Sequence, residues 1–316
     1  MKKRVLVTGA AGFLGQHLLK NLKNQRWQVT GTYLGGIPQT RYDHVTYVPL
    51  NILNSRDVVR LFESVKPDWV FHLAALTIPR DSWNNIEGTF QANVRGTLNI
   101  LEGARLQDFK PRIFFASTIQ VYGQSFRANE ALDERGTLWP DSPYAASKAV
   151  AELAILDYAK KFKVEAVIGR FANSVGCGQP AALVFPQWCR QISQIELSQA
   201  TAELATGNLE VYRDFLHAQD TANAMLVIMR KGRAGQVYNV ASGKTEKLKN
   251  YAQFLIQQSS KKIKLISQAG LRRKNEPRKM SVQVGKLKDL GWHPDRSVED
   301  GLQDLLRECR QSGEKK

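Results

Sequence analysis

The stretch VTGAAGFLG, residues 7–15, constrains the fold more than any other part of the sequence. Its glycines, Gly9, Gly12 and Gly15, follow a short apolar run and open a segment with helical spacing. Glycines at such places let the backbone turn sharply and approach a pyrophosphate, while the N–H groups and positive end of the following helix face that anion. A strand, a glycine-rich turn and a helix in this order predict a dinucleotide-binding unit.

Strand and helix patterns alternate along the first half of the chain. Strand patterns cover 4–9, 27–33, 45–50, 67–75, 111–118 and 164–170, and helical patterns cover 12–23, 55–65, 84–106 and 143–162. The alternation predicts an α/β fold, a Rossmann-type doubly wound parallel sheet. We expect a dinucleotide-binding domain over 1–175 and a smaller C-terminal substrate-binding lobe over 176–316, with segments of 211–240 returning to the sheet.

The end of the second predicted strand bears on which dinucleotide binds. A carboxylate there normally binds the ribose hydroxyls of NAD, but Tyr33 holds the place and no acid follows until Asp43. Arg41 is available to pair with a 2′-phosphate, so the sequence favours NADP(H) over NAD(H). The expected cofactor contacts are Gly9, Gly12, Phe13, Leu14, Gly15, Tyr33, Arg41, Asn51, Ile52, Leu73, Ala74, Ala75, Ser117, Tyr144, Lys148 and Phe171.

Tyr144 and Lys148 are four residues apart on a predicted helix, so they share one face. Tyrosine has an ordinary pKa of about 10, and a nearby ammonium is expected to lower it. A tyrosine tuned in this way passes a proton to or from a sugar oxygen while hydride moves to or from nicotinamide. Thr118, with Ser117 behind it, ends the preceding strand and can hydrogen-bond the same oxygen. We predict that Thr118, Tyr144 and Lys148 are catalytic.

Five motifs, TGAAGFLG, FHLAA, NVRGTLNILE, STIQVYG and PYAASK, occur in a familiar order and spacing. The chain resembles the extended short-chain dehydrogenase/reductases of the nucleotide-sugar epimerase/dehydratase type over nearly its whole length. The resemblance implies the same three catalytic residues, and it implies Asn93 as a structural or cofactor-supporting residue of the long helix. It also implies a homodimer, joined through the helices near 84–106 and 143–162.

Downstream segments resemble the GDP-sugar branch, the GDP-mannose 4,6-dehydratases and GDP-4-keto-6-deoxymannose reductases. The segments are RFANSVGCGQ, FPQWCRQISQIE, GNLEVYRDFLHAQDTANAM and LRRKNEP, with departures at Ser174, Cys177 and Lys274. The resemblance implies that Arg213 binds the pyrophosphate of a sugar nucleotide, which suits a guanidinium that forks onto phosphate oxygens. The alternative is a local Arg213–Asp214 salt bridge. The expected substrate contacts are Thr118, Gln120, Asn173, Arg190, Arg213, Arg273 and Glu276.

Ile119 and Gln120 bear on which reaction occurs. The 4,6-dehydratases of this family carry an acid, usually Glu, at the place of Gln120, after a Ser or Asp at that of Ile119. They need it because a base must remove the C5 proton and an acid must help expel the C6 hydroxyl. A neutral amide and an isoleucine can do neither. Dehydration is therefore not expected, and because the GDP-sugar-like segments resemble the 4-ketoreductases more, reduction of a nucleotide-linked 4-keto-6-deoxy sugar is favoured. C4 epimerisation is second, and a non-catalytic dinucleotide- or RNA-binding protein is a distant third.

The net charge of +16 is high for a small-molecule enzyme. Much of it lies in 261–288, which we interpret mainly as a solvated surface, with nucleic acid unlikely as a partner. Three cysteines and five histidines show no disulfide or metal-ligand spacing, so no metal is expected. No apolar run approaches the roughly 18 residues of a membrane span. We expect a cytoplasmic protein with no membrane partner.

Overall fold

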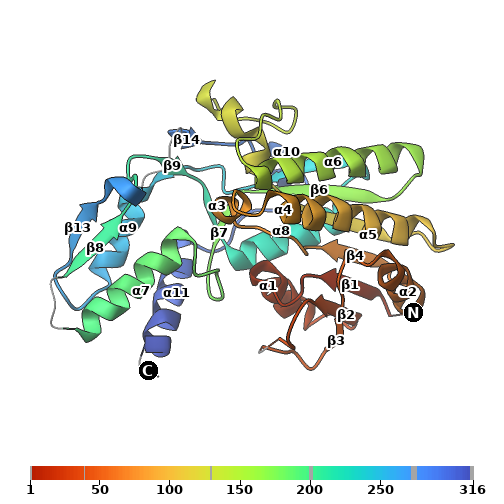
Figure 1. The fold of residues 1–316 in the computed structure, drawn as a ribbon, viewed down its shortest axis with the longest axis horizontal. Helices are drawn as coiled ribbons and strands as arrows, with labels where there is room; N and C mark the ends of the chain where they lie inside the picture. Colours follow the sequence, from red (N-terminus) through yellow and green to blue (C-terminus); the bar gives the residue numbers. More distant parts are fainter. Residues whose placement is uncertain (1, 39, 129, 199–201, 272–275, 314–316) are drawn as a thin grey trace.

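The computed structural model describes residues 2–38, 40–128, 130–198, 202–271 and 276–313 (Figure 1). Its centre is a seven-stranded parallel sheet in the order β11-β6-β5-β4-β1-β2-β3. The strands are β1 (Arg4–Thr8), β2 (Gln28–Tyr33), β3 (Val45–Pro49), β4 (Trp69–His72), β5 (Arg112–Thr118), β6 (Ala166–Phe171) and β11 (Gln236–Val240). The predicted α/β fold with a doubly wound parallel sheet is confirmed.

Helices cover both faces of this sheet (Figure 1). One face carries α1 (Phe13–Leu22) and α8 (Ala218–Lys231), and the other carries α2 (Ser55–Val65), α5 (Gly96–Arg105) and α6 (Pro143–Lys161). Val5 and Val7 of β1 pack in the first apolar cluster, while Leu6 packs in the second. Successive side chains of a strand point to opposite faces, so a strand covered on both faces is a continuous apolar run.

The order of the strands reverses between β1 and β4. From β1 the chain proceeds outward to β2 and β3, and from β4 it proceeds the other way to β5, β6 and β11. In doubly wound sheets, ligands bind in the crevice beyond the carboxyl ends of the strands at this reversal. The glycine-rich turn after β1 therefore lies at the place where a dinucleotide is expected.

The predicted long helix over 84–106 is not continuous. It consists of α4 (Ile86–Phe90), a π-helical turn (Gln91–Arg95) and α5. The break is near Asn93, which is buried. Its side-chain oxygen accepts from the Leu76 N–H (2.8 Å), and its side-chain nitrogen donates to Ser147 Oγ (2.9 Å). A wider turn at this point lets one side chain hold both the segment after β4 and α6, and such bulges are frequent at functional sites.

A smaller lobe lies beside the sheet, at the left of Figure 1. It contains α7 (Val184–Leu197), α9 (Leu248–Gln257) and α11 (Val298–Gly313), with β8 (Glu203–Thr206) paired in parallel to β13 (Lys264–Ser267). Its own apolar cluster centres on Phe185, whose ring centroid lies 4.5 Å from that of Phe215 and 5.6 Å from that of Tyr251. The lobe therefore has a core separate from the two that flank the sheet.

Short strands join the lobe to the sheet. β7 (Asn173–Val175) pairs with β10 (Phe215–His217), and β9 (Tyr212–Arg213) lies between β12 (Glu246–Lys247) and β14 (Lys279–Met280). The remaining elements are α3 (Pro79–Ser82), α10 (Gly285–Lys288) and the 3₁₀ segments Ile119–Ala128 and Ala269–Leu271. Within the described ranges, no helix is long and apolar enough to cross a membrane.

Candidate active site

The glycine-rich turn is built so closely that side chains would obstruct it. Gly9 has φ +68°, and a Cβ added there would lie 2.7 Å from the Ala74 backbone nitrogen. A Cβ at Gly15 would lie 2.4 Å from the Gly9 carbonyl oxygen. Helix α1 begins after Gly12 with no side-chain cap and no acid in its first turn. Its first N–H groups are thus available to an anion, so the turn fits a dinucleotide pyrophosphate.

Residues expected around the adenosine lie at the ends of β2 and β3. Tyr33 ends β2, half-buried, and its carbonyl accepts from the Leu50 N–H (2.9 Å). Arg41 is exposed, and its charge acts on the phenol of Tyr47 in β3. Asn51 is exposed, and its side-chain oxygen caps the Leu53 N–H (3.0 Å). Arg41 has the freedom of an exposed side chain.

The end of β4 lies against the glycine-rich turn. The Leu73 N–H donates to the Thr8 carbonyl (3.2 Å), and the Ala74 N–H donates to Thr8 Oγ1 (3.3 Å). His72, beside them, lies between Thr8 Oγ1 (2.8 Å) and Thr97 Oγ1 (3.0 Å). Burial, together with the charge of Lys148, lowers the pKa of His72 to about 3, so this imidazole is neutral. It therefore acts as a fixed polar link between strands and helix.

Other expected cofactor contacts lie around the same edge. Phe13 and Leu14 open α1, and Ala75 follows Ala74 in the half-buried segment after β4. Ile52 packs so closely on α5 that a Cβ at Gly96 would lie 2.4 Å from its Cδ1. Phe171 ends β6 as the register partner of Thr118, and its ring stacks on that of Phe114 with centroids 5.9 Å apart. Phe13 and Leu14 begin α1 and Phe171 ends β6, so these three residues lie at the ends of their elements.

Thr118, Tyr144 and Lys148 are brought together where β5 meets α6. Ser142 caps α6 by accepting from the Ala145 N–H (3.2 Å), and Pro143 occupies its first position, so the helix begins just before Tyr144. The Thr118 hydroxyl interacts with the Tyr144 phenol and acts to lower its pKa. Lys148 follows one turn later, with its ammonium 4.4 Å from the centroid of the Phe115 ring. All three side chains are at most 7% exposed.

The pKa values of this set differ from the expectation. Burial raises the pKa of Tyr144 to about 12, although its hydrogen bond with Thr118 acts in the opposite direction. Burial also lowers the pKa of Lys148 to about 7, and the nearby Glu152 carboxylate only partly offsets this. The predicted lowering of the tyrosine pKa by the lysine was therefore wrong for this conformation. Because both groups are buried, the desolvation cost of the phenolate outweighs the effect of Lys148, whose own pKa is lowered.

A buried ion pair that the sequence reasoning did not single out lies directly behind these residues. Glu152 is four positions after Lys148 on α6, and its carboxylate accepts from Arg170 of β6 with the shortest N–O distance at 2.6 Å. The Ser117 hydroxyl donates to the same carboxylate. Ser117, predicted as a cofactor contact, thus points to α6. The signal in the sequence was an acid within the otherwise apolar segment AVAELAI.

Gln120 and Ile119 begin the 3₁₀ segment that follows β5. The Gln120 backbone N–H donates to Thr118 Oγ1 (3.2 Å), and the Gln120 side chain is half-buried. Ile119 is 2% exposed and packs in an apolar cluster with Tyr122 and Phe126. Neither position presents a carboxylate beside Thr118 and Tyr144.

Asn173 and Arg213 lie on the short strands between sheet and lobe. The Asn173 side chain donates to the Asp214 carbonyl (3.1 Å). Arg213 forms a buried ion pair with Glu276 at 2.7 Å, so two expected substrate contacts meet each other. The Asp214 carboxylate instead accepts from the Ser242 and Gly243 N–H groups (2.9 and 2.8 Å). Asp214 therefore anchors the loop after β11, whereas Arg213 pairs with Glu276.

Arg190, another expected substrate contact, stands apart from this group. Arg190 is exposed on α7, and its charge helps to lower the pKa of the Cys309 thiol on α11. It therefore lies on the side of α7 that faces α11. Arg273 lies outside the described residues.

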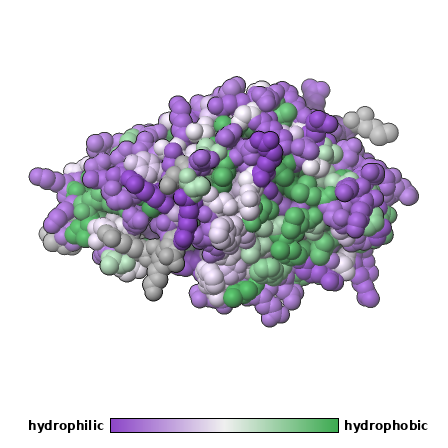
Figure 2. Space-filling view, turned by 90° about the horizontal axis from the view of Figure 1, so that it is seen from above, coloured by the Kyte–Doolittle hydropathy of each residue, from purple (hydrophilic) through white to green (hydrophobic). Residues whose placement is uncertain are grey.

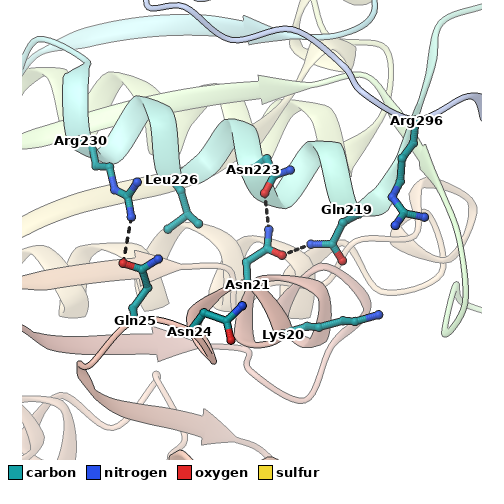
Figure 3. A pocket seen from close by; sticks show the side chains of 9 residues that line it. All are labelled: Lys20, Asn21, Asn24, Gln25, Gln219, Asn223, Leu226, Arg230 and Arg296. Carbon is teal, nitrogen blue, oxygen red and sulfur yellow. Dashed lines mark hydrogen bonds between the residues drawn. The ribbon is translucent and has the colours of Figure 1, made fainter.

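A surface cavity lies elsewhere, between α1 and α8 (Figure 3). Amide side chains line it: Asn21 donates to Asn223 (2.6 Å), and Arg230 donates to Gln25 (3.3 Å). None of the expected site residues is among its lining. The cavity is thus distinct from the crevice at the end of the sheet.

Comparisons with known proteins cover almost the whole chain. A family model described as GDP-mannose 4,6 dehydratase matches residues 6–305. GDP-6-deoxy-D-mannose reductase of Pseudomonas aeruginosa is 30% identical over 307 residues, 97% of this chain and 97% of that protein. dTDP-D-glucose 4,6-dehydratase of Mus musculus is 27% identical over 332 residues, 98% of this chain and 89% of that protein. Among solved structures, that of RMD from Pseudomonas aeruginosa complexed with NADPH has a TM-score of 0.84 at 26% identity, covering 98% of this chain and 100% of that chain.

Proposed function

The chain belongs to the GDP-mannose 4,6 dehydratase family, and from this premise we propose that it reduces a nucleotide-linked 4-keto-6-deoxy sugar with NADP(H). The observation that carries the proposal is the buried set of Thr118, Tyr144 and Lys148 with no carboxylate at positions 119 and 120. The 30% identity with a GDP-6-deoxy-D-mannose reductase supports the same reaction and a GDP-linked substrate.

Tyr144 acts as the proton donor in this proposal. A ketone that receives hydride becomes an alkoxide, and the alkoxide needs a proton from a group held within hydrogen-bond reach. Because its pKa is raised to about 12, the Tyr144 phenol is fully protonated at neutral pH. In this proposal the Thr118 hydroxyl, which interacts with the phenol, also contacts the carbonyl oxygen, and the Lys148 ammonium, four residues later on α6, favours the phenolate that remains. A high tyrosine pKa suits reduction better than oxidation.

The dinucleotide lies in the crevice beyond β1 and β4 in this proposal, with its pyrophosphate at the start of α1. Bound there, its nicotinamide supplies the hydride. Gly9, Gly12 and Gly15 leave space for the pyrophosphate because they have no side chains. Arg41 is the cation available to a 2′-phosphate. The absence of an acid at the end of β2, where Tyr33 stands, supports NADP(H).

The sugar nucleotide binds toward the lobe, where Asn173, Arg213 and Glu276 lie. Arg213 is 8% exposed and is held by Glu276. An ion pair that is already formed fixes the direction of the guanidinium, so a diphosphate can bind against this cation without much loss of rotamer entropy. We assign Gln120 to the sugar, because its backbone already bonds Thr118.

A spectrophotometric assay tests the proposed function. The protein is mixed with NADPH or NADH and with GDP-4-keto-6-deoxymannose formed in place by a separate dehydratase. Stoichiometric loss of the absorbance of the reduced cofactor is expected, faster with NADPH. No loss, with interconversion of C4 epimers of a nucleotide sugar, would replace the proposal with the epimerase alternative. A 4-keto-6-deoxy product formed from GDP-mannose itself would contradict the interpretation of Gln120 and Ile119.

The pH dependence of kcat/KM is expected to follow Lys148. A lysine is cationic below its pKa, and burial lowers the pKa of Lys148 to about 7, while the phenol of Tyr144 stays protonated to about pH 12. Ketone reduction should therefore be level below about pH 6 and fall up to about tenfold per pH unit above pH 7. The measurement is kcat/KM from pH 5.5 to 9, corrected for spontaneous cofactor loss. A rate that rises across this range would contradict the proposed roles.

We also propose a homodimer. Apolar side chains are exposed beside α4 and on α6, with Trp83 60%, Ile86 49% and Leu153 60% exposed. Figure 2 shows a hydrophobic area on the right-hand half of the face seen from above, the half that carries α4, α5 and α6 in Figure 1. Light scattering should give about twice the chain mass, and Leu153→Glu should give the single-chain mass. A wild-type protein that is monomeric at micromolar concentration would contradict this.

A further inference from the structure

Glu152 is the centre of a buried polar network that joins four parts of the candidate site. Its carboxylate accepts from Ser117 of β5 and from both Nε and Nη2 of Arg170 of β6. The residue is 0% exposed. The other end of the Arg170 guanidinium donates to the Tyr122 hydroxyl at 2.8 Å, in the segment that carries Gln120. Tyr122 in turn donates to Asn239 Oδ1 of β11 at 2.8 Å.

Burial of this pair needs an explanation beyond stability. Removing a carboxylate and a guanidinium from water costs several kcal/mol per ion, and well-packed apolar residues in place of such a pair are often equally stable. Buried charges near a cleft are more often tied to the chemistry of that cleft. Glu152 lies one helical turn from Lys148, and Ser117 is the neighbour of Thr118 in the chain. The pair is thus bonded to β5 next to Thr118 and lies on α6, the helix that carries Tyr144 and Lys148.

The charge near Lys148 comes mainly from Glu152. His72 of β4 is neutral, the Phe115 ring of β5 faces the ammonium at 4.4 Å, and Tyr144 is a neutral phenol. Arg170 of β6 is the other charged group, and its guanidinium donates to both oxygens of the Glu152 carboxylate, with the shortest contact, Nη2 to Oε2, at 2.6 Å. Glu152 is the acid that opposes the effect of burial on the lysine.

We propose that Glu152, one helical turn after Lys148 on α6, is a positioning residue for the reduction: its carboxylate favours the charged form of Lys148 and, through Ser117, ties the end of β5 that carries Thr118 to α6. The inference rests on the proposed function for its catalytic meaning. The interaction between Glu152 and Lys148 can nevertheless be measured without turnover.

The first experiment measures the ionisation of Lys148 directly. The full chain is labelled with ¹⁵N at lysine side chains, the Lys148 signal is assigned with Lys148→Met, and its pH titration is followed by NMR. Glu152→Gln is expected to lower the Lys148 pKa by about one pH unit or more, because a neutral amide no longer favours the ammonium. Glu152→Asp, which keeps the charge, should titrate close to the wild type. An unchanged titration in Glu152→Gln overturns the inference, whether or not the protein is active.

A matched control separates this effect from the loss of a buried ion pair in general. In the smaller lobe, Glu196 of α7 pairs with Arg310 of α11 through two N–O contacts of 2.8 and 2.7 Å. This pair belongs to elements other than β5 and α6, which carry the candidate catalytic residues. Glu196→Gln should lower thermal stability while leaving the Lys148 titration unchanged. If Glu152→Gln does not fold because Arg170 is left unpaired, Glu152→Gln/Arg170→Gln is used. This double variant should still titrate below the wild type, and equality with the wild type would again overturn the inference.

The second experiment concerns the Ser117 link. Ser117→Ala removes the hydroxyl but leaves the Glu152–Arg170 pair in place. It should lower kcat about tenfold, with the pH at which kcat/KM falls left unmoved, whereas Glu152→Gln should move that pH downward. A shifted Lys148 titration in a protein without reductase activity would refute the proposed function and keep the Glu152–Lys148 interaction. Wild-type kcat in Ser117→Ala would overturn the Ser117 part.

Discussion

Replacing Tyr144 with phenylalanine is expected to lower kcat for ketone reduction by about 10²- to 10⁴-fold, the usual value of a positioned proton donor. The substitution removes one hydroxyl and keeps the buried ring. Thr118 Oγ1 retains its bond from the Gln120 N–H at 3.2 Å, so little else should change. Affinity for NADPH, measured by its fluorescence, should remain within about threefold of the wild type, because the pyrophosphate is held by the turn after β1.

Tyr158 provides a matched control on the same helix. Its hydroxyl also makes a hydrogen bond, to Glu102 Oε1 of α5 at 2.6 Å, but on the part of α6 remote from Thr118. Tyr158→Phe should leave kcat unchanged while losing a comparable polar contact. Wild-type kcat in Tyr144→Phe would refute the proposed role of Tyr144. An equally large loss of kcat in both variants would also refute it, because it would indicate a general effect on α6.

Gly9→Ala is expected to lower dinucleotide affinity more than 100-fold and to destabilise the fold. The residue has φ +68°, which costs an L-residue about 1–2 kcal/mol. In addition, the new Cβ would lie 2.7 Å from the Ala74 backbone nitrogen and 2.9 Å from the Leu73 carbonyl carbon. Both contacts are with backbone at the end of β4, so neither can move without separating the two strands that flank the crevice. Affinity is measured by titration with NADPH, and stability by thermal unfolding.

Two glycines in the loop after β2 separate the causes. Gly35 has φ +86° and Gly36 does not have a positive φ, and a Cβ on either meets nothing within 4 Å. Gly35→Ala should therefore show the backbone cost alone, about 1 kcal/mol, and Gly36→Ala should show almost none. Both should bind NADPH normally. Normal binding by Gly9→Ala would refute the placement of the pyrophosphate at this turn.

The sequence predicted the fold well because its signals are local. The run RVLV followed by VTGAAGFLG specifies a strand, a turn and a helix without reference to the rest of the chain. Apolar runs covered on both faces and helices with one apolar side then require a parallel sheet between two layers. The structure confirms this architecture, and the matches over 6–305 confirm the family resemblance. The long helix was the exception, because the turn at Asn93 depends on contacts with Leu76 and Ser147.

The sequence predicted which residues form the site but not how they ionise or what they contact. Their roles remain predictions. The spacing of Tyr144 and Lys148 indicated a shared helix face, and the hydroxyls before Ile119 indicated a strand end. How deeply these groups are buried depends on elements far apart in the chain, and burial decides that the pKa of Tyr144 is raised rather than lowered. The pairing of Arg213 with Glu276, 63 residues later, was likewise beyond any local signal.

The sequence by itself thus determined the α/β fold, the family and the candidate reacting groups, since each depends on spacing along a helix, a strand or a turn. Tertiary structure alone decided how those groups ionise and what holds them. Glu152, Arg170 and Tyr122 come from three separate elements and meet only once the sheet and α6 have packed. Desolvation and charge interactions depend on distances in space between residues that are far apart in the sequence, and the sequence does not give those distances.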